Sequence, residues 1–288
     1  MTAAPDLALT ADNTNDARAI ASVSAAHFVS HVYILLLPPL FEVIRADYQV
    51  SYTELGLALV AFNALTGFFQ TPADRVGARI VLICGLLLGS AAVIVAGVVN
   101  SFWVFVAMFG LAGLGNAVYH PADYALLSHR VGSERLGRAF SIHTFSGMLG
   151  GAVAPALLLF LYGCVGWRGA FVATAMLGVA VAAALALQRD APMPRSHRDP
   201  VVDAGGGGDR QASLRLLLSP VILLNFIFFA LFAFANGGLQ TYAVVALSAA
   251  HDVPLAEGNI ALSGYLLLNA GGVLLGGLLL GRASPVLV

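Results

Sequence analysis

The chain has 288 residues, of which 59% are hydrophobic and 10% charged, whereas about 25% of the residues of a typical soluble domain are charged. So few polar side chains could not cover the surface of a soluble domain, which argues against a soluble enzyme. The net charge of −1 offers no basic patch for nucleic acid. Cys84 and Cys164 lie in or at the end of separate apolar segments, which indicates neither a disulfide framework nor a metal cluster. We therefore expect no cofactor and no bound metal.

Apolar stretches of about 20 residues recur along the chain, and each is long enough to cross a hydrocarbon core as a helix. They cover residues 19–43, 52–73, 80–99, 102–127, 138–162, 168–188, 216–245 and 258–280. Helices satisfy their own backbone groups in lipid, and the alternating pattern of a membrane β-barrel is absent from the sequence. The sequence predicts an all-α integral membrane protein.

The predicted spans fall into two groups. We expect a disordered cytoplasmic N-terminus over 1–18, six helices over 19–188 and two more helices over 216–282, with a tail at 283–288. The segment 189–215 between the groups carries four consecutive glycines and five arginines. This composition is typical of a flexible, solvated linker.

Arginine placement predicts the orientation of the chain in the membrane. With the N-terminus in the cytoplasm, twelve of the fourteen basic residues fall on the inner side, and only Arg45 and Arg168 fall outside. Positive charge accumulates on the cytoplasmic side of membrane proteins. We therefore predict that both termini are cytoplasmic and that the chain contacts the lipid of a plasma (inner) membrane.

A short motif follows the second predicted span, with Asp74, Arg75, Gly77 and Arg79 in the pattern D-R-x-G-x-R. It resembles the cytoplasmic signature loop of the major facilitator superfamily, whose transporters also carry six helices followed by a basic linker. The resemblance implies that these four residues latch helices together and gate the inner face. Gln70 stands where the family commonly has glycine, four residues before the aspartate.

Further stretches are similar to the fosmidomycin-resistance-like branch of that superfamily. They are His27-Phe28, Ser51 to Gly56, Gly113 to Asn116, His120 to Ala122, and Arg138 to His143. The resemblance implies a secondary transporter of a small organic solute, working as an exporter. The solute itself does not carry over from the resemblance, because many solutes are transported on this architecture.

The fifth predicted span contains Gly147, Gly150, Gly151 and Pro155. These positions resemble the glycine- and proline-rich motif of drug:proton antiporters, although alanine precedes the proline here and the fourth span lacks the arginine common in such antiporters. The alternative is ordinary close packing, because small residues allow two membrane helices to approach.

We single out five titratable residues within the predicted spans: His27 and His31 in the first, His120 and Asp123 in the fourth, and His143 in the fifth. Burying a titratable side chain in a membrane costs free energy, and such side chains therefore indicate ion or substrate pathways. Histidine in addition titrates near neutral pH. We predict a proton-coupling or substrate site built from these residues. Alternatively, each histidine hydrogen-bonds a neighbouring helix.

Transporters of this superfamily usually have twelve helices in two halves. The run from Gly276 to Arg282 resembles the start of the second signature loop, after which helices 9–12 would follow. We expect a chain that ends here to transport poorly alone, unless a homodimer completes it. A non-transporting remnant or scaffold is the alternative. An intramembrane enzyme is a second and minor alternative, because no H-E-x-x-H pattern accompanies the histidines.

Overall fold

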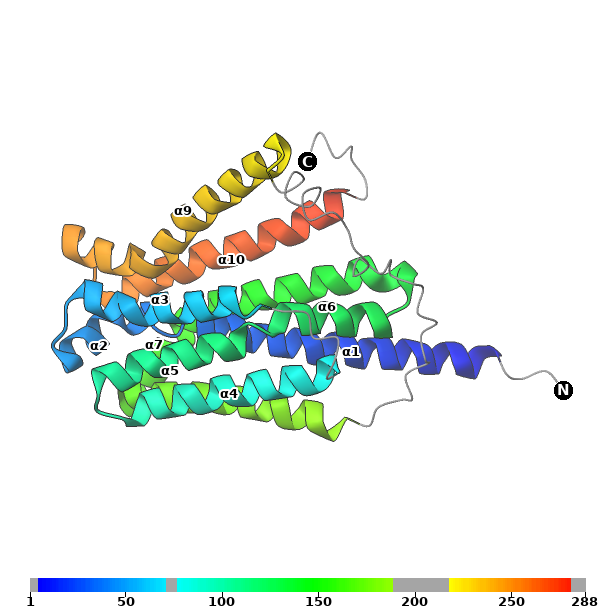
Figure 1. Ribbon diagram of the computed structural model, residues 1–288, viewed down its shortest axis with the longest axis horizontal. Coiled ribbons are helices and arrows are strands. Elements are labelled where there is room, and N and C mark those ends of the chain that lie inside the picture. The colour runs from blue at the N-terminus through cyan, green and yellow to red at the C-terminus, as the bar shows by residue number, and fades with distance from the viewer. Residues whose placement is uncertain (1–4, 71–76, 189–217, 281–288) are drawn as a thin grey trace. The chain divides into compact units, whose positions relative to one another are not determined.

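The computed structural model describes residues 5–70, 77–188 and 218–280, and these are mostly α-helical (Figure 1). The helices in chain order are α1 Pro5–Ile34, the 3₁₀ turn η1 Pro38–Leu40, α2 Phe41–Tyr48, α3 Tyr52–Phe68, α4 Ala78–Val98, α5 Phe102–Asn116, α6 Tyr119–Arg130, α7 Ser133–Leu187, α9 Pro220–His251 and α10 Leu255–Leu280. Six helical stretches of the described chain are long and apolar enough to cross a membrane. The predicted all-α membrane class is confirmed.

The helix α7 contains two of the predicted spans. Its backbone leaves helical geometry at Gly166, where φ is 71° and ψ is 172°. Only glycine adopts such angles readily, so the chain breaks there into the predicted fifth and sixth helices. Arg168, just beyond the break, contacts a carboxylate oxygen of Asp47 at 2.9 Å.

The start of the chain differs from the prediction in two ways. The first helix ends at Ile34 instead of continuing to residue 43, because Pro38 and Pro39 interrupt it and the chain turns through η1. Proline has no backbone N–H and disfavours a helical residue before it. The helix also begins at Pro5, within the segment predicted to be disordered. Asp16 anchors it there by pairing with the Arg135 guanidinium at 2.6 Å.

The fourth predicted span is divided into α5 and α6. The interruption covers residues 117 and 118, with Pro121 in the first turn of α6. A continuous helix would need an N–H on residue 121 to bond the carbonyl of residue 117, and proline has none. The break leaves His120 and Asp123 on a short separate helix.

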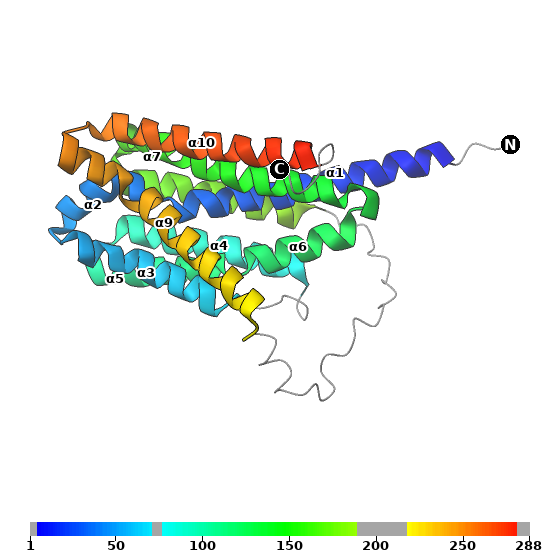
Figure 2. The ribbon, with the colours of Figure 1, turned by 90° about the horizontal axis from the view of Figure 1, so that it is seen from above.

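Helices α1, α4, α5 and α7 run alongside one another in both views (Figures 1 and 2). Glycines bring some of them very close: a Cβ added to Gly115 of α5 would lie 2.8 Å from the carbonyl oxygen of Gly85 in α4. Small residues at contacts are how membrane helices approach closely. Helix α10 packs on α1 and α7, where Leu262 and Leu266 join an apolar cluster with Val32.

The chain divides into two units, one formed by residues 1–188 with 244–288 and the other by residues 189–243. The described part of the second unit is the first three-quarters of α9. Its phenylalanines are exposed, among them Phe226, Phe228 and Phe234. An apolar helix surface of this kind is suited to lipid contact.

Candidate functional site

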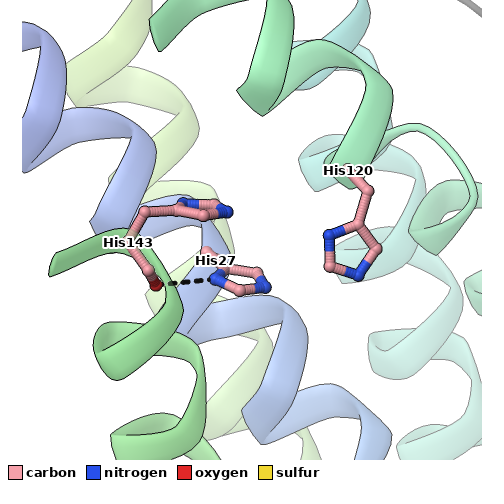
Figure 3. Close-up of side chains that lie close together, drawn as sticks. All are labelled: His27, His120 and His143. Carbon is pink, nitrogen blue, oxygen red and sulfur yellow. Dashed lines mark hydrogen bonds between the residues drawn. The ribbon is translucent and has the colours of Figure 1, made fainter. Parts of the chain in front are cut away.

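Three helices of the first unit each contribute a histidine to one cluster: His27 from α1, His120 from α6 and His143 from α7 (Figure 3). The His27 and His143 rings are stacked, with centroids 3.9 Å apart and planes 12° from parallel. The His120 ring centroid lies 5.2 Å from that of His27. We call these three residues the histidine cluster.

The other two predicted candidates lie beside the histidine cluster. His31, one turn further along α1, meets the His27 ring edge-on at a centroid distance of 4.7 Å. A carboxylate oxygen of Asp123 lies 3.8 Å from Nε2 of His143. The structure therefore brings together all five titratable residues that the sequence analysis singled out. Whether they couple protons stays a prediction.

Half of the side-chain polar atoms of these five residues are buried without a hydrogen bond to the described chain. His27, His143 and Asp123 are 4%, 1% and 0% exposed, while His120 is more accessible. Nδ1 of His27 bonds the carbonyl oxygen of His143 at 2.8 Å. Nε2 of His27, both ring nitrogens of His143 and both carboxylate oxygens of Asp123 have no hydrogen-bond partner among the described residues. Buried polar atoms are normally satisfied, so these five unsatisfied atoms stand out among the described residues.

The predicted glycine motif of α7 allows α7 to approach α1 at this site. A Cβ added to Gly147 would lie 2.5 Å from Cε1 of His27. One added to Gly150 would overlap the carbonyl oxygen of Phe28 and lie 3.0 Å from its carbonyl carbon. Gly151 is less crowded, and Pro155 lies further along inside α7. The motif thus sets the contact of α7 with α1, while its part in antiport stays a prediction.

The predicted gating loop is only partly described. Asp74 and Arg75 lie outside the described residues. Gly77 has φ of 86° and directly precedes α4. The Arg79 guanidinium donates hydrogen bonds to carbonyl oxygens at the end of α7: Nε to Leu185 at 3.0 Å, and a terminal nitrogen to Leu185, Ala186 and Gln188. Positive side chains stabilise the carboxyl end of a helix, so Arg79 holds the first turn of α4 to the last turn of α7.

Replacing Arg79 with alanine should lower the free energy of unfolding by about 1–2 kcal/mol, since the bonds are charge-assisted but partly exposed to water. The midpoint of thermal unfolding in detergent measures this loss. Arg79→Lys keeps the charge but not the forked donors, and we expect about half the loss. Equal unfolding midpoints for Arg79→Ala and the unaltered chain would show that the contact between Arg79 and the end of α7 does not stabilise the fold.

Sequence reasoning missed two further polar features. The Tyr33 hydroxyl donates to the carbonyl oxygen of Ala175 at 3.1 Å and lies 2.9 Å from the Ser90 hydroxyl, which joins α1, α4 and α7. At the α2 end of the bundle, a cavity of about 550 Å³ is lined partly by Glu42 and Tyr52. The partners come from segments far apart in the chain, so no local pattern could have shown either feature.

The sequence profile of the Major Facilitator Superfamily matches residues 23–288. The chain belongs to this superfamily. The predicted family is confirmed. The chain is therefore a multi-pass membrane protein of a transporter family. Membership of this family does not favour the alternative of an intramembrane enzyme. Several of its curated relatives are named as transporters or efflux proteins.

One relative is named as a probable L-galactonate transporter of Escherichia coli strain K12. It is 29% identical over 143 residues, which are 48% of this chain and 32% of the relative. Another, the multidrug efflux protein YfmO of Bacillus subtilis strain 168, is 28% identical over 224 residues, 76% of this chain and 55% of the relative. The chain therefore spans about a third to a half of the length of these relatives.

A solved structure has the same fold. It is a bacterial homologue of the human lysosomal transporter Spinster, in an inward-facing, unoccupied conformation. The match has a TM-score of 0.79 and 19% sequence identity, and it covers 94% of this chain and 64% of the other. At this identity the likeness establishes the fold alone.

Proposed function

We propose that this chain serves in secondary transport and exports a small organic solute in exchange for protons. The observation that carries the proposal is the buried carboxylate of Asp123 beside the histidine cluster, within a bundle of the major facilitator fold. Ionisable groups inside a membrane are characteristic of proton relays and ion pathways. The efflux protein among the relatives supports the direction of transport.

In this proposal, Asp123 and His143 exchange the proton. They lie on α6 and α7, 3.8 Å apart, and neither has a hydrogen bond from these atoms to the rest of the described chain. Gain or loss of a proton changes the charge between the two helices, so it changes their preferred packing. A change in helix packing between two access states is how a transporter of this fold moves its site from one side to the other.

The cavity at the α2 end supports a solute of modest size. Its volume of about 550 Å³ lies within the range of small-molecule sites. Glu42 and Tyr52 give it a polar side, and Tyr162, Val244 and Leu255 give it an apolar one. We propose that a solute with both polar and apolar parts occupies this cavity on its way out.

Proton flux in inverted membrane vesicles tests the proposal. Respiration acidifies the vesicle interior, and an acid-sensitive dye reports the gradient. Adding L-galactonate or the organic cation ethidium, chosen from the two classes that the relatives' names give, should release protons and restore fluorescence. Vesicles without the protein are the control. No proton release, and no accumulation of either compound, would contradict the proposal and favour the non-transporting alternative.

The finer assignments of location and assembly also stay proposals. We place both termini in the cytoplasm and the protein in the plasma membrane because of the arginine distribution. A homodimer is proposed only for a protein that consists of the eight predicted spans, in which case the partner would supply the missing part of the second half. Crosslinking in the native membrane, with the mass of the product measured, tests both the assembly and the length of the protein.

A further inference from the structure

We propose that the histidine cluster binds a divalent late first-row transition metal ion, with Zn²⁺ as the representative ion and Asp123 supplying negative charge beside it. This goes against the expectation from the sequence that no metal is bound. The proposal does not rest on the proposed function, because ion binding requires no transport. The two proposals share His143, so a bound ion would compete with the proton for its ring nitrogen. One ligand nitrogen each from His27, His120 and His143 lies within 4.8 Å of the other two.

The first argument is the tautomer of His27. A carbonyl oxygen can only accept a hydrogen bond, so Nδ1 of His27 donates its hydrogen to the carbonyl oxygen of His143 at 2.8 Å. In the neutral ring, Nε2 then carries a free lone pair, and Nε2 is buried without a hydrogen bond among the described residues. A backbone carbonyl that holds one ring nitrogen and leaves the other for the ion is the usual support of a metal-binding histidine.

The second argument is the set of unsatisfied atoms around that lone pair. Both ring nitrogens of His143 and both oxygens of Asp123 are buried without hydrogen bonds within the described ranges. A single ion could take a nitrogen from each histidine, and the nearby Asp123 carboxylate would offset its charge. If these helices only packed against one another, the same nitrogen and oxygen atoms would stay without partners. Burying unpaired polar atoms in a membrane costs free energy.

The third argument is distance. Zinc–nitrogen bonds of about 2.0–2.1 Å in a tetrahedron place ligand nitrogens about 3.3 Å apart. The widest permitted separation in the cluster is 4.8 Å, so the rings must close by roughly 1.5 Å at most. His120 is the most accessible of the three and can rotate its side chain. The His27 and His143 rings must also turn out of their stacked arrangement, because the lone pair of each imidazole lies in its own ring plane. The three ligands would then join α1, α6 and α7 at one point.

The chemistry of the donors selects the ion. Imidazole nitrogen suits Zn²⁺, Cu²⁺, Ni²⁺ and Co²⁺, whereas Mg²⁺ and Ca²⁺ prefer oxygen ligands. Three imidazoles with one carboxylate nearby therefore favour Zn²⁺ over Mg²⁺ in the same titration. Co²⁺ is a useful substitute, because its visible absorption reports tetrahedral coordination by nitrogen and oxygen.

The experiment is a metal titration of the full chain in detergent, purified with an affinity tag that contains no histidine and treated with a chelator. Equilibrium dialysis with Zn²⁺ should give one ion per chain, and Co²⁺ should produce a tetrahedral spectrum that Zn²⁺ removes. His120→Ala and His143→Ala should each weaken binding at least about tenfold. His129→Ala, on the exposed end of the same helix as His120, is the matched control and should bind as the unaltered chain does.

A thermal measurement keeps the test informative if His143→Ala folds poorly. Zn²⁺ should raise the unfolding midpoint of the unaltered chain and of His129→Ala but not that of His120→Ala, since a ligand that binds only the folded state stabilises it. Absence of stoichiometric Zn²⁺ binding would overturn the proposal. So would binding that survives both cluster substitutions, or binding that Mg²⁺ reproduces.

Discussion

Replacing Asp123 with asparagine is expected to reduce solute-driven proton flux by about tenfold or more, because it removes the buried carboxylate proposed to exchange the proton. The two side chains have nearly the same volume, and Asp123 is 0% exposed, so the packing of α6 is preserved. Both carboxylate oxygens lack hydrogen bonds among the described residues. Removing a buried acid that has no hydrogen bond among these residues therefore should not lower the free energy of unfolding.

Two measurements on the same preparation separate coupling from folding. Proton release in inverted vesicles should fall, while the midpoint of thermal unfolding in detergent should stay unchanged or rise. Asp47→Asn is the matched control: this carboxylate pairs with Arg168 at 2.9 Å and lies away from the histidine cluster. We expect its flux to be retained. Unchanged flux in Asp123→Asn would remove this residue from the coupling mechanism.

Substituting Gly150 with valine should destabilise the bundle by about 2–3 kcal/mol, because overpacking a tight contact costs this much. The new Cβ would overlap the carbonyl oxygen of Phe28 and approach its Cα to 3.1 Å. These are backbone atoms, so the clash is relieved only if α1 and α7 move apart. Glycine and valine differ by only a few tenths of a kcal/mol in helix propensity, and the loss therefore reports the contact.

The thermal unfolding midpoint of Gly150→Val should accordingly fall by about 5–10 °C. Gly163→Val is the control on the same helix, since a Cβ at Gly163 has nothing within 4 Å, and its midpoint should change by less than about 2 °C. Because α1 also carries His27, the separated helices should lose proton flux as well. Equal midpoints for the two valine variants would show that α7 does not depend on this close approach to α1.

The sequence by itself determined the fold class, the family and the approximate positions of the spans. Apolar length and arginine placement are local properties, so they can be read without knowing which helices meet. The break before Pro121 could likewise be predicted, because proline lacks the required N–H. The end of the first helix at Ile34 was missed, although Pro38 and Pro39 carry the same signal.

Only the tertiary structure decided which of the candidate residues meet. His27, His120 and His143 are polar points on three helices, and nothing in their spacing states that the His27 and His143 rings stack 3.9 Å apart. The same holds for Arg79, whose acceptors at the end of α7 lie more than 100 residues away in sequence. Helix rotation and packing, set here by glycines such as Gly147 and Gly150, determine which polar faces meet, and these depend on the whole bundle.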